Sequence, residues 1–274
     1  MFIYDAIPLV DCSGGKSMNV CIDVGNTTIA MGFYLNDKFH SKMVHNTIVN
    51  RTEDEYVVLL NDTFSSLKIN KGEIDRIIYS SVVPSINQPF KAAIRRVLNK
   101  EVLSVGPGIK TGLLLKVDNP SEVGSDLIAD LVGAKEKYGY PTLVIDLGTA
   151  SKILLIDRNG AFTSCLILPG LSLSAASLTS KAALLPEVSL ETPKSVLAKN
   201  TVEAMNAGIV FGHADMILGL VNRYEKEIGY SCQRILTGGS AVYLKDIMGP
   251  SFKYDPIVTL DGLNIILRKN EVKL

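Results

Sequence analysis

The sequence lacks several features that mark large classes of proteins. Its 274 residues carry 28 basic and 28 acidic side chains, so no net charge attracts nucleic acid or an anionic membrane surface. The basic residues are scattered, and the densest group, KAAIRR at 91–96, is expected on the solvated face of a helix. We therefore expect no nucleic-acid partner.

Cysteine and histidine are scarce as well. The four cysteines form no C-x-x-C pair, which favours free thiols in a reducing cytosol over a disulfide framework or a zinc site. Cys21 and Cys165 lie in apolar, strand-like segments and are expected to be buried. His40, His45 and His213 show no metal-binding spacing, so we expect structural roles for them.

No run of apolar residues approaches the roughly 20 needed to span a membrane. Residues 1–17 have no basic start and carry Asp5 and Asp11, which is unlike a signal peptide. We expect them to be an N-terminal extension ahead of the first strand. With 47% hydrophobic residues to build a core, the chain is expected to be a soluble cytoplasmic protein without a membrane partner.

Strand-like and helix-like segments alternate along the chain, which is typical of an α/β fold. Thr52 and Glu55 form a capping-box pattern that predicts the start of a helix. Helices are predicted at 52–69, 85–100 and 121–139. Strands are predicted at 19–25, 28–35, 75–83, 101–105, 142–157 as a pair, 161–168, 232–237 and near 257–260.

One pattern occurs twice. CIDVGNTTIAMGFYLND at 21–37 and VIDLGTASKILLIDRNG at 144–160 align without a gap, at an offset of 123 residues (146 minus 23). This offset is too long for a solenoid and fits two domains built alike. We predict an N-terminal domain at 18–118 and a C-terminal domain at 119–274, with a nucleotide cleft between them.

Each copy of the pattern ends a strand in Asp-x-Gly. The glycine lets the backbone turn tightly, so that successive N–H groups point into one cavity and can bind phosphate oxygens. The acids, Asp23 and Asp146, make sense beside phosphate if a cation such as magnesium lies between them. The alternative is that both aspartates only cap turns. The repetition favours the phosphate site.

Two further segments are rich in glycine. TGGSA at 237–241 supplies a third turn, where the backbone of Gly238 and Gly239 can lie against an adenine or a ribose. CSGGKS at 12–17 ends like a Walker A loop, but the first glycine of that motif falls at Val10. We therefore reject a Walker A site.

Together these motifs resemble the superfamily of acetate and sugar kinases, Hsp70 chaperones and actin, and more narrowly the type III pantothenate kinases. The resemblance covers about 19–265. It is carried by DVGNTT (23–28), GPGIKTG (106–112), NPSEVGSD (119–126), DLGTAS (146–151), PG (169–170), ALLP (183–186), NT with AGI (200–209) and TGG (237–239).

The resemblance implies two duplicated RNase H-like domains of the actin-like ATPase kind. It also implies ATP-dependent phosphorylation of pantothenate to 4′-phosphopantothenate, the first step of coenzyme A synthesis, in a homodimer that uses Mg²⁺ and a monovalent cation, K⁺ or NH₄⁺. Asp126 would be the catalytic base, at a helix start whose N–H dipoles favour its ionised form.

The resemblance assigns the other site residues by position. Metal ions would be bound by Asp23, for Mg²⁺ through water, and Asp146, for the monovalent cation. The implied pantothenate site is lined by Gly124, Ser125, Asp126, Leu127 and Thr201. The implied ATP-binding residues are Asp23, Val24, Gly25, Asn26, Thr27, Thr28, Ile29, Ala30 and Thr149, joined by Gly238 and Gly239 from the third turn.

The sequence departs from the family pattern at three places. Leu127 replaces an arginine expected to hold the pantothenate carboxylate or a nearby acid, Lys152 replaces a threonine, and Ser164–Cys165 replace two glycines. Losing one charge-assisted hydrogen bond costs about 1.5–3 kcal/mol. The sequence therefore leaves open a kinase of pantothenate or of a related hydroxyl compound, and a degenerate paralogue that binds nucleotide or a partner. The Lys152 ammonium is expected to reduce the need for the monovalent cation.

Overall fold

The computed structural model describes residues 17–271, which divide into two compact units. Among these residues, unit 1 comprises those up to 112, 121–133 and those from 259 onward, and unit 2 comprises 113–120 and 134–258. The expected extension, 1–17, and the rejected Walker A segment lie outside the described residues except for Ser17.

The domain limits expected from the sequence, 18–118 and 119–274, stay a prediction, as does a nucleotide cleft between the domains. The contacts group 121–133 and the C-terminal residues with unit 1, so each unit is assembled from separate stretches of chain.

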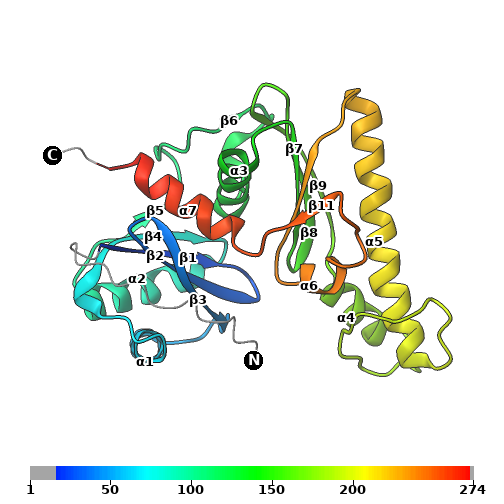
Figure 1. Ribbon diagram of the computed structural model, residues 1–274. Coiled ribbons are helices and arrows are strands. Elements are labelled where there is room, and N and C mark those ends of the chain that lie inside the picture. The colour runs from blue at the N-terminus through cyan, green and yellow to red at the C-terminus, as the bar shows by residue number, and fades with distance from the viewer. Residues whose placement is uncertain (1–16, 272–274) are drawn as a thin grey trace. The chain divides into compact units, whose positions relative to one another are not determined.

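Unit 1 is built on a five-stranded sheet in the order β3-β2-β1-β4-β5 (Figure 1). β1 and β2 form an antiparallel hairpin, β3 extends it, and β4 pairs parallel to β1. The strands are β1 (Met18–Val24), β2 (Thr28–Leu35), β3 (Lys38–Asn46), β4 (Ile74–Ser81) and β5 (Leu103–Ser104).

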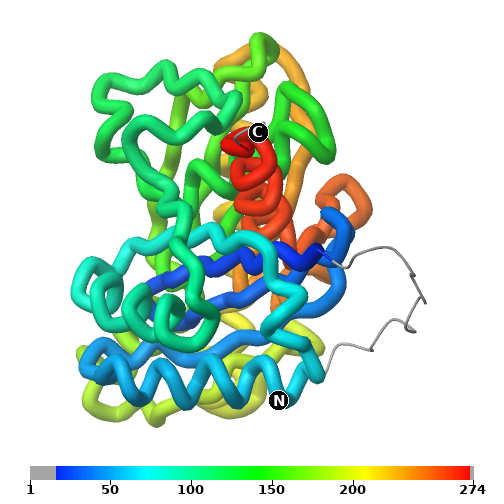
Figure 2. The backbone as a smooth tube through the Cα atoms, turned by 90° about the vertical axis from the view of Figure 1, so that its left-hand side faces the viewer, coloured from blue at the N-terminus to red at the C-terminus, as the bar shows by residue number. Residues whose placement is uncertain are grey.

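Helices α1 (Glu53–Ser66) and α2 (Pro84–Leu98) pack on one face of this sheet, and α1 lies beside its strands in Figure 2. The hydrophobic core forms there because alternate residues of β1, such as Val20 and Ile22, point toward the helices. Tyr56 of α1 and Phe90 of α2 meet edge to face, with ring centroids 4.7 Å apart. A short 3₁₀ turn, Lys71–Glu73, leads into β4.

Helix α7 (Val258–Lys269) packs on the opposite face of the same sheet through residues from 259 onward. Gly32 of β2 has no side chain, which leaves room for Leu260. Asn19 Nδ2 donates a buried hydrogen bond to Asn264 Oδ1 (3.0 Å), although 245 residues separate them. The end of the chain is therefore part of the core of the first unit.

Unit 2 repeats this topology. Its sheet has the order β11-β10-β7-β8-β9-β6, so β9-β8-β7-β10-β11 matches β3-β2-β1-β4-β5 strand for strand. The antiparallel and parallel pairings also correspond. The strands are β6 (Leu114–Leu115), β7 (Thr142–Leu147), β8 (Ala150–Ile156), β9 (Ala161–Pro169), β10 (Gln233–Thr237) and β11 (Phe252–Tyr254). The duplication predicted from the sequence is thus confirmed.

The core of unit 2 lies between this sheet and helices α4 (Leu171–Lys181), α5 (Thr201–Ile228) and α6 (Ala241–Leu244). By length and composition, α5 could cross a membrane, but long core helices share these properties. Its buried residues, among them Val210, Ile217 and Val221, pack in the core of unit 2. We interpret α5 as a core helix.

Helix α3 (Ser125–Tyr138) follows a 3₁₀ turn at Pro120–Glu122. Its first residues belong to unit 1 and its residues from 134 onward to unit 2. The α3 helix ends before Gly139, whose φ of +77° is the left-handed conformation expected of a C-terminal glycine.

Most elements lie where the sequence predicts them, and the capping box of α1 is present: Thr52 N–H donates to Glu55 Oε2 (2.7 Å) and Glu55 N–H donates to Thr52 Oγ1 (3.3 Å). The strand predicted near 257–260 is wrong, because α7 begins at Val258. The Asp255 carboxylate accepts from the Ile257 N–H (3.1 Å) ahead of that helix.

The predicted burial of Cys21 is confirmed, and its burial raises the pKa of the thiol well above the usual value. Cys165, on β9, is only half-buried, so the prediction that it is buried holds in part.

We expect Gly262→Ala to destabilise unit 1. A Cβ at this buried position of α7 would lie 1.9 Å from the Ala129 carbonyl oxygen of α3, so the two helices would have to separate. Overpacking of this kind costs about 1–3 kcal/mol. Urea unfolding followed by circular dichroism measures the change.

Gly219→Ala is the matched control. Gly219 is exposed within α5 and nothing lies within 4 Å of the position of its Cβ, so alanine should stabilise the helix by up to about 1 kcal/mol. Equal stabilities for the two variants would contradict the tight packing of α7 on α3.

Candidate functional site

The first acid-glycine turn lies at the end of β1 in unit 1. Gly25 N–H donates to the Thr28 carbonyl (2.9 Å), which closes the turn. The side chains of Asn26, Thr27 and Thr28 are exposed, whereas Asp23 is half-buried behind them. The turn therefore exposes the side chains of Thr27 and Thr28 beside a half-buried carboxylate, which is in keeping with the phosphate-site hypothesis.

Thr47, the first residue after β3, fixes this turn from the side. Its Oγ1 donates to the Gly25 carbonyl (2.7 Å), and its N–H donates to the Thr27 carbonyl (2.9 Å). Two carbonyl oxygens of the turn are thus satisfied from one neighbouring residue. The turn is held in shape before any ligand binds.

Asp126 lies at the same edge of the unit 1 sheet. β1 and β4 run parallel, with Asp23 opposite Ser80 and Val24 opposite Ser81. Ser125 joins this edge, because Ser80 Oγ donates to Ser125 Oγ (3.0 Å) and Ser81 N–H donates to the same oxygen (3.1 Å).

Because Ser125 begins α3, these hydrogen bonds fix the helix start at the ends of β1 and β4. Asp126 follows in the first turn of the helix, where the helix dipole favours a carboxylate. Ile128 N–H donates to the Gly124 carbonyl (3.1 Å), so Gly124 stands at the helix N-terminus. Unit 1 therefore brings Asp23, the first acid-glycine turn and Asp126 to the same edge of its sheet.

The second acid-glycine turn, in unit 2, joins β7 to β8 and has the same support. Gly170, the first residue after β9, donates its N–H to the Thr149 carbonyl (3.1 Å). A Cβ on Gly170 would lie 2.4 Å from the carbonyl oxygens of both Gly148 and Thr149, so only glycine fits this contact. Thr149 is exposed at the tip of the turn.

Gly238 packs against this turn from the end of β10. Thr237 lies opposite Asp146 in the parallel β7–β10 pair, and Gly238 follows with a φ of +89°. A Cβ there would lie 2.5 Å from the Leu147 nitrogen and 2.6 Å from Asp146 Oδ1. The predicted third glycine turn therefore contacts the second acid, and Asp146, Thr149 and Gly238 are brought together.

The two turns differ in length. In unit 1 the residue opposite Val24 is Ile29, whereas in unit 2 the residue opposite Leu147 is Ser151, which makes the second turn one residue shorter. The gapless alignment therefore holds only as far as the glycines. The residue opposite the acid is Ala30 in unit 1 but Lys152 in unit 2.

Lys152 is paired with Asp146. Its Nζ lies 2.9 Å from Asp146 Oδ2, and the two side chains are only 18% and 14% exposed. The shorter turn is responsible, because it aligns the lysine directly across the hairpin from the acid.

The remaining predicted residues differ in their exposure to solvent. Val24 and Ile29 are fully buried in the core of unit 1, so only their backbone can contact a ligand. Thr201 is exposed at the first position of α5, after Asn200, whose Oδ1 accepts from the Glu203 N–H (2.9 Å). Leu127 is half-buried in the first turn of α3.

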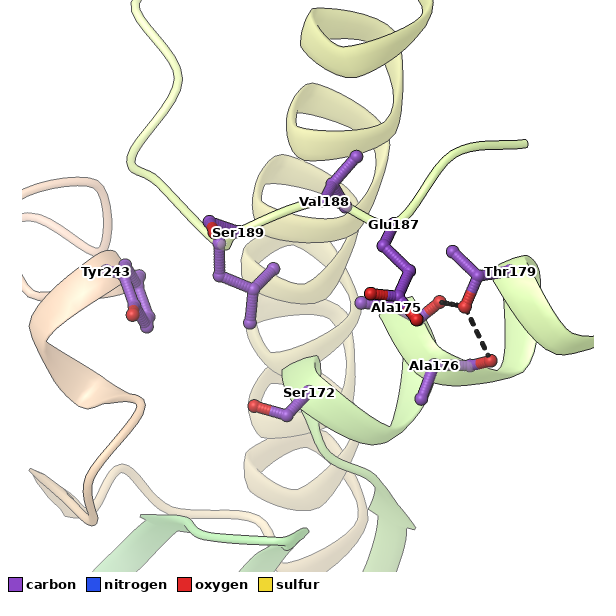
Figure 3. A pocket seen from close by; sticks show the side chains of 9 residues that line it. Ser172, Ala175, Ala176, Thr179, Glu187, Val188, Ser189 and Tyr243 are labelled. Atoms are coloured by element: carbon purple, nitrogen blue, oxygen red, sulfur yellow. Dashed lines mark hydrogen bonds between the residues drawn. The ribbon is translucent and has the colours of Figure 1, made fainter.

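Two cavities lie within unit 2. The larger, about 900 Å³, runs between α4 and α5, and Thr201, Met205 and His213 are among its lining residues. The smaller, about 480 Å³, is bounded by α4, the 187–190 segment and Tyr243 (Figure 3). In it the Thr179 hydroxyl donates to the Ala176 carbonyl (3.0 Å) and Glu187 supplies the charge, which does not suit an anionic ligand.

His213 has a structural partner, as expected from the sequence. Its Nε2 lies 2.8 Å from Ser151 Oγ, and both side chains are buried in unit 2. Burial lowers the pKa of His213 below the usual value, because the charged imidazolium is poorly solvated there. His45 also has a side-chain partner, because its Nε2 lies 2.8 Å from Thr63 Oγ1.

Sequence reasoning did not assign roles to Thr47 and Gly170. The signal was present, since these residues are separated by the same 123 positions as the two acids (170 minus 47).

Among residues 17–271, no three His, Cys, Asp or Glu side chains form a group that could hold a metal ion.

Comparison with known proteins identifies close sequence relatives. The family model for type III pantothenate kinases matches residues 19–223. A type III pantothenate kinase from Exiguobacterium sibiricum is 39% identical over 254 residues, covering 93% of this chain and 100% of the relative. Another, from an Exiguobacterium sp. strain, is 36% identical over the same length and coverage.

Solved structures share the fold at low sequence identity. The ethanolamine utilization protein EutJ from Carboxydothermus hydrogenoformans aligns with a TM-score of 0.53 and 13% identity, covering 96% of this chain and 92% of that one. A reductive activator for a corrinoid, iron-sulfur protein aligns with a TM-score of 0.52 and 13% identity, covering 94% and 62%. The predicted fold class, duplicated α/β units of the actin-like ATPase kind, is confirmed.

We expect Gly238→Ala to disturb the second turn. The new Cβ would meet the Leu147 backbone and the Asp146 carboxylate, and alanine would be strained at a φ of +89°. The stability should fall by about 1–3 kcal/mol. Thermal unfolding measures the loss, with Gly239→Ala as control, because that exposed neighbour has nothing within 4 Å of its Cβ position. Equal losses in the two variants would count against the close contact of Gly238 with the turn.

His213 should make stability depend on pH. Its pKa is lowered in the folded state, so the unfolded chain takes up the proton more readily once the pH falls below about 6.5. Stability is then fully present above that pH and is lost as the pH falls further. Urea unfolding of wild type and His213→Gln between pH 8 and pH 5 should show a smaller acid loss in the variant. An identical pH dependence in the two proteins would refute this assignment.

Proposed function

Because the chain belongs to the type III pantothenate kinase family, we propose that it transfers the γ-phosphoryl group of ATP to the hydroxyl group of pantothenate. The product, 4′-phosphopantothenate, makes this the first step of coenzyme A synthesis. Besides family membership, one observation supports the proposal. Asp23, the first acid-glycine turn and Asp126 cluster at one edge of the unit 1 sheet.

In the proposed reaction, Asp126 acts as the general base. Its carboxylate accepts the proton of the pantothenate hydroxyl as that oxygen forms a bond to the γ-phosphorus. The bond from the γ-phosphorus to the β,γ-bridging oxygen breaks, and ADP leaves with the electron pair. Support comes from the position of Asp126 in the first turn of α3, where helix N–H groups favour the ionised carboxylate.

The turn at 25–28 would bind the phosphates of ATP through its backbone N–H groups and the hydroxyls of Thr27 and Thr28. Support for this role is that Thr47 holds the turn in one shape, so little ordering is needed on binding. The family resemblance implies nucleotide contacts at Thr149, Gly238 and Gly239 of unit 2 as well.

Magnesium would be held by Asp23 through water. A single half-buried carboxylate suits this ion, which keeps several waters and takes other ligands from substrate phosphates. When bound, the ion neutralises charge on the phosphates. The residues present therefore fit magnesium bound together with ATP.

Pantothenate would lie against the start of α3, at Gly124, Ser125 and Leu127. For Thr201 of α5, a role in pantothenate binding is implied by the family resemblance alone. Leu127 offers no charge to the pantothenate carboxylate, so we expect weaker pantothenate binding than an arginine there would give, by on the order of ten- to a hundredfold. We further propose that the enzyme is cytoplasmic and acts as a homodimer, in keeping with the family.

Asp126→Asn should abolish pantothenate-dependent turnover while leaving the fold intact. An amide cannot accept the hydroxyl proton, so we expect the rate to fall by about 10²- to 10⁴-fold. A coupled assay of ADP release with and without pantothenate measures the effect. Asp246→Asn, which removes an exposed carboxylate in unit 2, is the control and should retain wild-type activity.

The same assay separates the proposal from its alternative. Nucleotide binding without turnover on pantothenate or on related hydroxyl compounds would identify a degenerate paralogue. Undiminished turnover in Asp126→Asn would exclude Asp126 as the base.

A further inference from the structure

The partly buried ion pair formed by Lys152 and Asp146 distinguishes the second acid-glycine turn from the first. Nζ and Oδ2 are 2.9 Å apart, and each side chain is less than a fifth exposed. In the equivalent position of unit 1, Ala30 lies across from Asp23 and brings no charge to that acid. The duplicated scaffold thus carries a fixed ammonium group at one of its two acid-glycine turns.

This pair lies immediately beside the second turn. Asp146 Oδ1 lies against Gly238, and Lys152 reaches the other carboxylate oxygen, Oδ2. Thr149, the proposed nucleotide contact, is three residues after Asp146 at the exposed tip. The charge of the lysine is therefore placed next to the backbone that would contact the nucleotide.

The residues present do not fit the monovalent cation implied by the family resemblance. An ammonium group resembles a potassium ion in charge and size, and here it lies on a carboxylate oxygen that such an ion would need. A second cation beside it would meet like-charge repulsion in a poorly solvated site. Asp146 is thus not available to a free cation in the way the resemblance implies.

We propose that Lys152 is a covalently attached substitute for the monovalent cation. It neutralises Asp146 and supplies the positive charge beside the second turn, so ATP binding requires neither K⁺ nor NH₄⁺. This inference rests on the proposed function for the identity of the nucleotide.

The test measures MgATP binding by isothermal titration calorimetry in KCl and in choline chloride at equal ionic strength. Wild type should bind with the same Kd in both salts. Lys152→Thr should bind about tenfold more weakly in choline, because it leaves a partly buried carboxylate uncompensated, and should regain affinity in KCl. Lys194→Thr removes the same charge from an exposed segment of unit 2 and should behave as wild type.

Thermal unfolding without nucleotide provides a second measurement. KCl should raise the Tm of Lys152→Thr relative to choline chloride and leave wild type unchanged. If Lys152→Thr does not fold, Lys152→Met keeps the length of the side chain without its charge and takes its place in both measurements. A wild type that needs potassium, or a Lys152→Thr that ignores it, would overturn the proposal.

The outcomes distinguish the two proposals. A wild type that binds MgATP equally in both salts but never phosphorylates pantothenate refutes the proposed function and leaves the inference standing. A potassium-dependent wild type that phosphorylates pantothenate refutes the inference alone. A wild type that binds no MgATP in either salt refutes both.

Discussion

The structure depends on how the carbonyl oxygens of its two acid-glycine turns are hydrogen-bonded. A turn that presents N–H groups to a ligand must satisfy its own carbonyl oxygens elsewhere. In each unit the residue after the third strand does this, Thr47 in unit 1 and Gly170 in unit 2. The third strand is therefore required for the site as well as for the sheet, which explains why the whole β-meander is duplicated and not the turn alone.

The two copies have diverged through their turn lengths. Removing one residue from the second turn shifts the register of β8 against β7, so a different residue lies across from the acid. The outcome is an alanine opposite Asp23 and a lysine opposite Asp146. Duplicated scaffolds can acquire distinct chemistry in this way without any change in the strands themselves.

Much of the fold follows from local sequence. The apolar alternation of β1 and the capping box at Thr52 are short-range signals, and both are found where the sequence predicts them. The repeated Asp-x-Gly is also a short-range signal, and it predicts both turns. The strand expected near 257–260 is wrong because these apolar residues resemble a strand in isolation, whereas Leu260 packs against Gly32 of β2, which is distant in sequence.

The parts of the site that sequence did not predict depend on long-range register. The residues around Lys152 in the sequence do not show that it lies across from Asp146. This pairing arises because the second acid-glycine turn is one residue shorter than the first. Likewise, the link from Ser125 to the end of β4 joins residues 44 positions apart in the chain. Residue types could be recognised as suited to phosphate chemistry, but their pairing is a property of the folded chain.

The hydrogen bond between Asn19 and Asn264 has a consequence for biosynthesis. Since α7 follows β1 by more than 200 residues, the face of the first sheet that α7 covers stays open until α7 has been translated. Closing a loop of this length carries a large entropic cost and slows folding. While α7 is still being made, the nascent chain therefore carries a sheet face on which Asn19 and Gly32 have not yet met their partners in that helix.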